Sequence, residues 1–561
     1  MADLVTVNTL LSLIALWAVY WLKRSNTAPT KDEGNDGWWK RNPVVGLPKG
    51  MLPWLRSLIK SLTRTRAWVF EGYSKFSKSN MFFTVPTLDK GRVLVVPPEQ
   101  VKAIYRLPDT VLDAMTTANM TIQNEWTVWD EKITHSGGHV MVKLISNRIT
   151  RNLSFLTPII AREIENGFAR EWGSSKTEWK DISLWTSSLN LIAGAANGAF
   201  FGEHFFATGR DMGFLTRLQD HAKMLFFGSI VINCTPKPLR FLSGYFIGWV
   251  MHFLFLRAAR YIMPTVKDRL RQAERLRADP NYDWTPPQDG LQWGIEEAYE
   301  SGDLEQLDPT RVALRMVYLN DVSMHSTSYT ALNVILDLAS LDPSHGYIDA
   351  LRAESGRALK AAGGSWTRAA VNELKLIDST VRESMRLTPF NSVGITRTVI
   401  DPHGISVKQG DTETKIPPGT VLGIPVEPIH YDESFYPNAH EFYPFRFVSP
   451  EVARGVLNQQ KTAAKADGSS ATGIGACHTE EKTSVTIDDS FVTFGLGKHA
   501  CPGRFFALNE IKILVAHMVL HYDIEHLKGG RAKMTPILWL NAPLFNRFNV
   551  RIRRRTPAEL A

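Results

Sequence analysis

Residues 310–341 contain neither glycine nor proline, and they follow Asp308-Pro309, a pair that favours the start of a helix. Thirty-two helical residues would extend about 48 Å, which is long for a soluble domain. The next proline is in Asp342-Pro343, where the predicted helix ends. The fold of this chain must therefore accommodate one very long helix.

The middle of this helix is unusually polar. Hydroxyl groups inside a helix can bond back to carbonyl groups, open the helical ladder and admit water. A solvated polar face is the alternative, but the polar residues are nearly consecutive and do not keep to one face. They are Asn320, Asp321, Ser323, His325, Ser326, Thr327 and Ser328.

The rest of the chain is mostly helical in pattern. Helical periodicity dominates from after Val96 to about Leu387 and returns after Pro502. Short β-type runs occur at 82–96 and 395–424, and residues 537–552 predict a terminal hairpin. No βαβ alternation is present, so the sequence predicts a mainly α fold with small segregated β-sheets, of the α+β class.

Composition narrows the class further. Apolar residues make up 44% and charged residues 21% of the 561 residues, which excludes wholesale disorder, a fibrous repeat and a polytopic membrane protein. Cys234, Cys477 and Cys501 are too few for a disulfide framework or a zinc site with four thiolates. The net charge of +8, without a long basic run, fits a membrane face or an acidic protein partner better than nucleic acid.

The first residues predict a membrane anchor. Residues 5–22 are uncharged over about 27 Å of helix, close to the thickness of a bilayer core, and Lys23-Arg24 places the rest of the chain in the cytoplasm. A cleaved signal peptide is the alternative, but Asp3 replaces a basic start. We therefore predict an anchor at 1–24, a linker with a Pro/Gly elbow at 25–50 and a single domain at 51–561.

Two further segments stand out. Residues 241–256 form an uncharged run between Arg240 and Arg257, short for a membrane span. A buried core helix and a helix that dips into the bilayer surface both remain open for this run. Residues 454–487 contain almost no large apolar residue, which predicts a flexible surface insertion.

The strongest local pattern surrounds Cys501. Residues 494–503 read Phe-Gly-Leu-Gly-Lys-His-Ala-Cys-Pro-Gly, and an apolar helical pattern follows. The glycines favour a tight turn, Pro502 suits the first helical position, and Cys501 would then cap the helix. A thiol there is favoured as thiolate by the helix dipole and unpaired N–H groups. A buried structural cysteine is the alternative, but the neighbouring glycines and proline argue against it.

Phe494, Gly497, His499, Cys501 and Gly503 together resemble the haem-binding signature of the cytochrome P450 monooxygenases, with His499 where many members carry Arg. The resemblance covers nearly the whole chain and is closest to fungal microsomal members of secondary metabolism. It implies the cytochrome P450 fold behind one transmembrane helix, with haem b whose iron is bound by Cys501. Phe494, Gly495 and Gly503 would shape the cofactor site.

Two other segments match the family in order. Glu383 and Arg386 share one face of a predicted helix, and the resemblance pairs them with Arg446 in a structural lock. On the long helix, Ser323-Met-His325-Ser326-Thr327 takes the place of the family's oxygen-activating pattern. Ser326 would supply the hydroxyl that hydrogen-bonds oxygen. His325, in the place of the usual acid, would deliver protons, and Thr327 completes the predicted catalytic group.

Haem propionates need cations. The resemblance gives this role to Arg397 at the opening of a strand and to His499 in the cysteine loop. His139 and Lys143, spaced i, i+4 where many members have Trp and Arg, are further candidates.

The implied reaction inserts one atom of O2 into a lipophilic small molecule, by C–H hydroxylation or successive oxidation. Electrons would come from NADPH through NADPH–cytochrome P450 reductase, with cytochrome b5 as a possible second donor, at a face that carries Lys498. Fungal resemblance points to terpenoids, alkaloids or polyketides at the endoplasmic reticulum membrane. Two alternatives are an enzyme of epoxidation, desaturation or oxidative rearrangement, and a membrane-anchored haem binder or sensor without turnover.

Overall fold

The computed structural model describes residues 42–134, 138–202, 211–409, 412–463, 481–544 and 548–556. The predicted anchor at 1–24, most of the linker and Cys477 lie outside the described residues. The described chain falls into two compact units. The smaller comprises the described residues up to Ala118, Asn391–Ile429 and Pro536–Ala542, and the larger comprises Asn119–Phe390, His430–Thr535 and the described residues from Pro543.

The smaller unit is built on a five-stranded sheet in the order β1-β2-β8-β5-β3. Its strands are β1 (Phe83–Thr87), β2 (Gly91–Val95), β3 (Leu112–Asp113), β5 (Gly394–Val399) and β8 (Val421–Ile424). β2 and β8 pair in parallel and the other neighbours are antiparallel. A separate hairpin joins β6 (Ile405–Gln409) to β7 (Thr412–Ile416). The β-type runs predicted at 82–96 and 395–424 are thus confirmed. Strands form there because Val, Phe and Leu side chains at these positions fit a buried sheet.

Three helices accompany this sheet: α3 (Pro53–Lys75), α4 (Pro98–Ile104) and α19 (Val426–His430). Next to them along the chain, α5 (Met115–Ile122) leads into the larger unit. A two-stranded sheet is formed by β10 (Thr535–Ile537) and β11 (Leu540–Ala542).

The larger unit is helical. Its helices are α6 (Asn124–Thr127), α7 (Glu131–Thr134), α8 (Gly138–Lys143), α9 (Leu153–Glu171), α10 (Leu184–Phe201), α12 (Asp211–Cys234), α13 (Arg240–Ala278), α14 (Gly290–Glu300), α15 (Pro309–Ala339), α16 (Tyr347–Ala361), α17 (Arg368–Asn372), α18 (Lys375–Leu387), α20 (Pro450–Ala463) and α21 (Arg504–His521). A small sheet has the order β4 (Lys180–Ser183), β12 (Asn549–Arg554) and β9 (Tyr522–Ile524). The mainly α prediction with small separate sheets is confirmed.

The predicted terminal hairpin is wrong. β11 pairs with β10, whereas β12 pairs antiparallel with β4 and β9, which come from elsewhere in the chain. Val550 lies opposite Ile182, and Ile552 lies opposite Ile524. The pairing is decided by which apolar strand faces are available for burial, and the local sequence does not contain that information.

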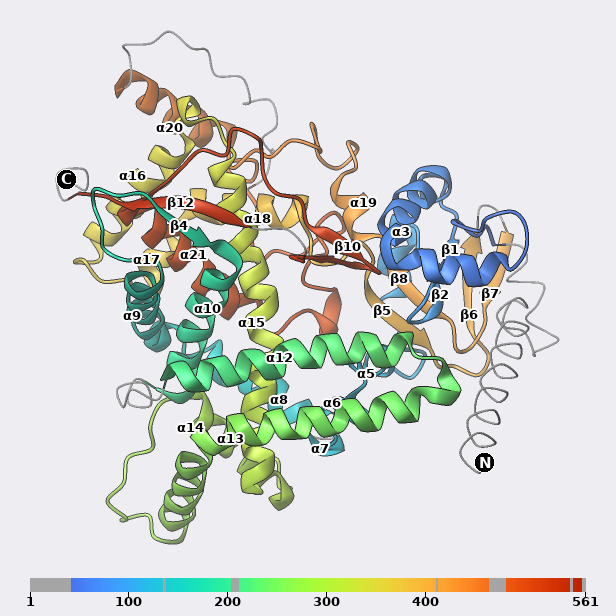
Figure 1. The fold of residues 1–561 in the computed structure, drawn as a ribbon, viewed down its shortest axis with the longest axis horizontal. Coiled ribbons are helices and arrows are strands. Elements are labelled where there is room, and N and C mark those ends of the chain that lie inside the picture. Colours follow the sequence, from blue (N-terminus) through green and yellow to red (C-terminus); the bar gives the residue numbers. More distant parts are fainter. Residues whose placement is uncertain are drawn as a thin grey trace, which may run out of the picture. The chain divides into compact units, whose positions relative to one another are not determined.

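The long helix α15 is the centre of the larger core. Its start is held by Asp308, whose side chain accepts hydrogen bonds from the backbone N–H groups of Thr310 and Arg311 at 2.9 and 3.0 Å. Figure 1 shows α12 and α13 lying side by side, with α15 crossing them. Most side chains of α15 are buried, as expected for a helix covered on several sides.

The uncharged run 241–256 belongs to α13, and one face of it is exposed. Ile247, Met251 and Phe255 are buried, but the outward side chains are at least half exposed. Lys237–Ala278 is long and apolar enough to cross a membrane, and only 22% of its most apolar window is buried. The reading as a buried core helix is therefore wrong for this outer face. Its residues are Phe241, Leu242, Tyr245, Phe246, Trp249, Phe253 and Leu256.

The predicted insertion at 454–487 lies only partly within the described residues. Residues 454–463 continue α20, and 464–480 lie outside the described residues. Beyond that gap, Ser484 is buried, and its backbone N–H and hydroxyl both donate to Asp378 at 2.7 and 2.6 Å. The prediction of a flexible surface insertion therefore does not hold for these two flanking segments.

Candidate functional site

The loop before α21 is closed by its own backbone. Gly495 and Gly497 have φ angles of 82° and 60°, which favour glycine, and the N–H of Cys501 donates to the carbonyl of Phe494 at 2.7 Å. A Cβ at Gly495 would lie 3.1 Å from the carbonyl oxygen of His499. The two glycines thus allow residues 494–501 to return on themselves, and this return positions the cysteine.

Cys501 is an unbridged, exposed cysteine at the end of this loop. The helix begins at Arg504 with Gly503 before it, so the prediction that Cys501 caps the helix is wrong by two residues. Although Cys501 reaches solvent, neighbouring protein partly desolvates its sulfur, which raises the pKa of the thiol, while hydrogen bonds from the Gly503 and Arg504 N–H groups lower it. The expected thiolate-favouring contacts exist, but in the protein alone they are outweighed.

The space above Gly503, two residues after Cys501, is open. The nearest atom to a Cβ built on Gly503 is Ile145 Cγ2, at 3.9 Å. Ile145 lies in a π-helical segment, Leu144–Ile149, that continues α8. His139 and Lys143 both belong to α8, as their spacing predicts, and the Lys143 side chain is exposed. The side chain of His139 lies outside the described part of the structure.

The two remaining cation candidates belong to different units. His499 is half-buried in the 3₁₀ turn Gly497–His499 of the larger unit. Arg397 lies on β5 of the smaller unit, where it donates to the carbonyl of Tyr105 at 2.9 Å and its guanidinium lies 4.7 Å from the centre of the Tyr105 ring. Burial raises the pKa of Tyr105 and Arg397 lowers it. The Tyr105 hydroxyl is buried without a hydrogen-bond partner among the described residues.

The polar middle of α15 is divided between two environments. Ser326 is exposed, whereas Thr327 is buried and its hydroxyl donates back to the carbonyl of Ser323 at 2.7 Å. His325 packs against Trp185 of α10 and Phe226 of α12, with ring centres 6.2 and 5.3 Å away. Burial, followed by the charge of Lys223, lowers the pKa of His325 to about 4. Its imidazole is therefore neutral at pH 7, and its Nε2 has no hydrogen-bond partner in the described chain.

One turn earlier, α15 holds a polar network that the sequence did not reveal. His221 Nδ1 of α12 lies 2.9 Å from Asp321, and both side chains are fully buried. Asn197 of α10 donates to Asn320 at 2.7 Å. Through these contacts, neighbouring helices supply hydrogen-bond partners for the buried Asp321 and Asn320 of α15. The residues of each pair lie too far apart in sequence for any local pattern to join them.

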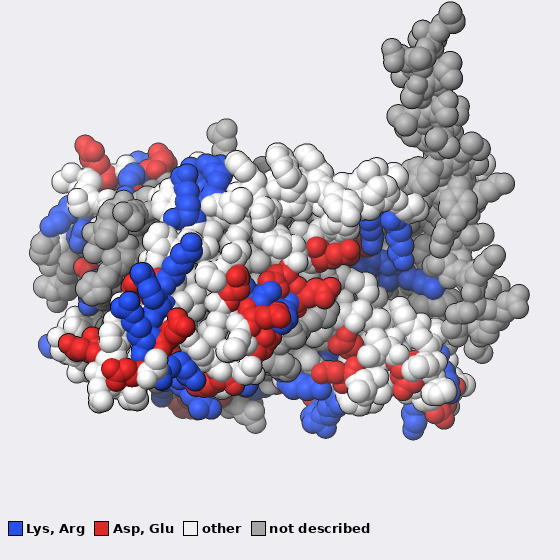
Figure 2. All heavy atoms as spheres, turned by 90° about the horizontal axis from the view of Figure 1, so that it is seen from below, with Lys and Arg blue, Asp and Glu red and all other residues white. Residues whose placement is uncertain are grey.

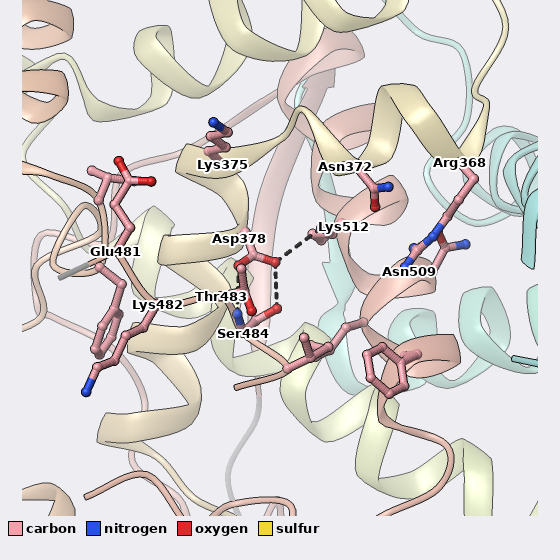
Figure 3. Close-up of a pocket in the computed structure, with 15 residues that line it drawn as sticks. Arg368, Asn372, Lys375, Asp378, Glu481, Lys482, Thr483, Ser484, Asn509 and Lys512 are labelled. Carbon is pink, nitrogen blue, oxygen red and sulfur yellow. Dashed lines mark hydrogen bonds and ion pairs between the residues drawn. The ribbon is translucent and has the colours of Figure 1, made fainter. Parts of the chain in front are cut away.

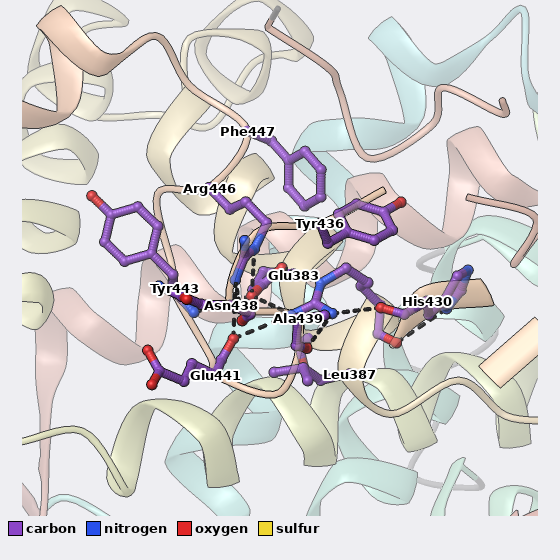
Figure 4. Close-up of polar contacts among 12 residues, drawn as sticks. Glu383, Leu387, His430, Tyr436, Asn438, Ala439, Glu441, Tyr443, Arg446 and Phe447 are labelled. Atoms are coloured by element: carbon purple, nitrogen blue, oxygen red, sulfur yellow. Dashed lines mark hydrogen bonds and ion pairs between the residues drawn. The ribbon is translucent and has the colours of Figure 1, made fainter. Parts of the chain in front are cut away.

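Figure 4 shows the cluster around Glu383. The Glu383 carboxylate accepts from Arg386 at 2.7 and 2.8 Å and from Arg446 at 2.9 Å, and all three side chains are fully buried. Burial raises the pKa of Glu383, but the two guanidinium groups hold it below its ordinary value. Arg386 also donates to the carbonyls of His430 and Ala439, at 2.6 Å each. The predicted structural lock is confirmed, and it fastens the 430–446 segment to α18.

Known proteins resemble this chain over most of its length. A family model described as Cytochrome P450 matches residues 258–546. The cytochrome P450 monooxygenase okaG of Penicillium ochrochloron is 37% identical over 518 residues, covering 92% of this chain and 94% of the relative. The monooxygenase gloP of Glarea lozoyensis is 30% identical over 501 residues, 87% of each chain. The monooxygenase htyF of Aspergillus rugulosus is 29% identical, covering 95% of this chain and 74% of the relative.

Proposed function

The chain belongs to the cytochrome P450 family of haem-dependent monooxygenases, and from this premise we propose that it inserts one atom of O2 into a lipophilic small molecule of secondary metabolism. Hydroxylation of a C–H bond, once or in succession, is the proposed reaction, and terpenoids, alkaloids and polyketides are the proposed substrate classes. The observation that carries the proposal is the unbridged, exposed thiol of Cys501 at the end of a glycine-closed loop.

The residues at the loop fit haem. Within the described ranges, no group of three or more His, Cys, Asp or Glu side chains could hold a metal ion, which suits a metal at Cys501 whose other ligands come from a cofactor. Gly503 leaves the approach to the thiol free of a side chain, and Phe494 and Gly495 hold the loop. When bound, haem would supply the activation of O2.

Four cationic or imidazole side chains are our proposed partners of the haem propionates. Arg397, His499, Lys143 and His139 would balance the two carboxylates of haem b. Tyr105, whose ring lies under the Arg397 guanidinium, has a buried hydroxyl that adds a hydrogen-bond donor the sequence did not suggest.

Oxygen chemistry would depend on the polar face of α15. Ser326 is the hydroxyl we propose for hydrogen bonding to oxygen and for ordering water, because it is exposed and the Thr327 hydroxyl is committed to the helix backbone. His325 would act as a neutral imidazole that positions water through Nε2, because with a pKa of about 4 it carries no positive charge at pH 7.

We propose that the protein sits on the endoplasmic reticulum membrane with its catalytic part in the cytoplasm. The uncharged run at 5–22 would span the bilayer, and the exposed apolar face of α13 would dip into its surface. Lys237 lies before this face and Arg257 and Arg260 come after it, which suits lipid headgroups. Figure 2, viewed from the α13–α14 side, shows a broad area without charged residues and basic side chains near it.

Electrons would come from NADPH through NADPH–cytochrome P450 reductase, or through cytochrome b5. Lys498 is exposed in the cysteine loop, and Arg504 is the first residue of α21. These cations suit an acidic protein surface.

Epoxidation, desaturation or oxidative rearrangement is the second candidate, favoured by the unusual His325-Ser326 pair on α15. The test is expression of the chain with a reductase, feeding of lipophilic scaffolds and mass spectrometry of the products. A gain of one oxygen supports oxygen insertion, and a loss of two hydrogens supports desaturation. Absence of reductase-dependent O2 consumption with every scaffold would favour a haem binder or sensor without turnover.

A further inference from the structure

A cavity lies between α17, α18 and α21. Its volume is about 290 Å³, and all of its lining residues belong to the larger unit. Figure 3 shows Lys512 reaching to Asp378 on one side and Arg368 beside Asn509 on the other. The segment 481–485 closes the opposite wall.

Positive charge exceeds negative charge around this cavity. The lining includes four cationic side chains and two acidic ones: Arg368, Lys375, Lys482, Lys512, Asp378 and Glu481. Lys512 pairs with Asp378 and Lys482 pairs with Asp488, each at 3.1 Å. Arg368 and Lys375 form no ion pair with any residue in the described ranges, so the positive charges of these two side chains lack an acidic partner there.

The guanidinium of Arg368 is oriented by a neutral side chain. Its guanidinium donates to Asn509 Oδ1 at 2.7 Å, and the amide of Asn509 is held in turn by Thr157, at 3.2 Å. Asn509 is fully buried and neutral, so it orients the guanidinium without compensating its charge. Burial lowers the pKa of Arg368 and only the more distant Asp378 raises it. A half-buried cation without a counter-charge is a poor arrangement unless an anion completes it.

The remaining lining is apolar. Val448, Val485, Phe505 and Leu508 line the cavity next to these polar groups. A carboxylate would form charge-assisted hydrogen bonds with Arg368, and an attached apolar body would contact these side chains. We propose that this cavity binds a small organic carboxylate with an apolar body, whose carboxylate lies between Arg368 and Lys375.

Such a ligand would act on the helix that comes after the cysteine. Phe505, Leu508, Asn509 and Lys512 of the cavity all lie on α21, which begins three residues after Cys501. Binding would fasten α17 and α18 to α21 and would stabilise the folded protein by mass action. The site is independent of the proposed oxygen chemistry.

The test is titration of the full-chain protein with benzoate at constant ionic strength, followed by calorimetry and by the absorption spectrum of haem. Saturable heat without a change in the haem spectrum is expected, with acetate and benzyl alcohol each binding at least about tenfold more weakly. Arg368→Gln should weaken benzoate binding at least about tenfold. Lys360→Gln, an exposed lysine of α16 outside the cavity, is the matched control and should stay within about twofold.

Glu481→Gln covers the case in which the arginine variant does not fold, because removal of an acid from the rim should tighten benzoate binding by roughly two- to fivefold. Heat that rises without saturation, or equal losses in Arg368→Gln and Lys360→Gln, would overturn the proposal. A shift of the haem spectrum in parallel with the heat would place the benzoate at the haem instead and overturn it as well.

Discussion

Glu383 accepts a hydrogen bond from Arg446 Nε at 2.9 Å, although 63 residues separate the two along the chain. With Arg386, this makes one carboxylate the counter-charge of two fully buried guanidinium groups. Such a pair contributes little by itself, but loss of one partner leaves charge buried without compensation.

Glu383→Gln should therefore destabilise the fold severely. Two buried cations would lose their counter-charge, and the free energy of unfolding should fall by about 3–5 kcal/mol. Chemical denaturation measures this, and loss of bound haem should accompany it. Glu71→Gln is the control, because Glu71 pairs with Lys75 on the exposed side of α3 and its loss should change stability by about 0.5 kcal/mol or less. Equal effects of the two variants would contradict the role of the cluster.

Glu354 should make the stability depend on pH. Burial raises its pKa to about 7 from 4.5, although the N–H groups of Leu376 and Ile377 donate to it and lower the pKa. Between these two values the folded chain keeps a proton that the unfolded chain releases, so stability should fall as the pH rises through this window, by up to about 3 kcal/mol.

Glu354→Gln removes that titration. Relative to the unaltered protein, the variant should gain stability at pH 8 compared with pH 5, as measured by denaturation at both values. Glu71→Gln serves again as the exposed control. Parallel pH profiles for Glu354→Gln and the unaltered protein would show that Glu354 does not titrate in this way.

Loss of the Ser326 hydroxyl and loss of the Thr327 hydroxyl should have different effects on the reaction. Ser326→Ala removes an exposed hydroxyl, so electrons should be diverted from product to peroxide, while the folded protein and its haem content remain. Thr327→Val removes a hydroxyl that donates to the Ser323 carbonyl, and coupling should change little. The measurement is peroxide formed per NADPH consumed with a substrate present. If only Thr327→Val lost coupling, the role proposed here for the Ser326 hydroxyl would belong to Thr327 instead.

Cys501→Ser should abolish the red-shifted carbon monoxide band of the reduced protein, because a thiolate ligand is required for it. Cys234→Ser and Cys477→Ser should leave the band unchanged. Difference spectra of the three purified variants decide this. Persistence of the band in Cys501→Ser would remove the basis of the proposed haem site.

The apolar face of α13 should bind lipid without the amino-terminal run. Protein that lacks residues 1–41 should still float with anionic vesicles, and Trp249→Glu should weaken this at least about threefold, because the indole is 69% exposed on that face. Gln272→Glu places the same charge on the polar half of α13 and is the control. If both variants float alike, α13 is not the contact.

How much of the structure the sequence predicts depends on how far apart along the chain the interacting residues lie. The bounds of α15 are predicted to within two residues because the Asp308 cap is local chemistry. The loop of Cys501 is predicted because its glycine positions encode its backbone. In contrast, β12 finds partners far away in the chain, so a terminal hairpin was the wrong local expectation.

The same reason explains what was missed at the site. Tyr105 meets Arg397 from 292 residues away, and His221 meets Asp321 from 100 residues away. An isolated imidazole has a usual pKa, and that of His325 is lowered by burial, where rings of α10 and α12 pack against it, and by the charge of Lys223. No property of the residue itself carries that information.

The smaller unit is made of three stretches that are distant in sequence, and this affects how the protein is made. Asp89 accepts a hydrogen bond from the Trp539 indole, 450 residues later, and the Leu62 carbonyl accepts from Leu538. During synthesis, its early stretch leaves the ribosome long before its last strand exists. That early stretch must stay soluble while the larger unit is translated, and a message that stops short of residue 536 yields a protein in which Asp89 and the Leu62 carbonyl never meet Trp539 and Leu538.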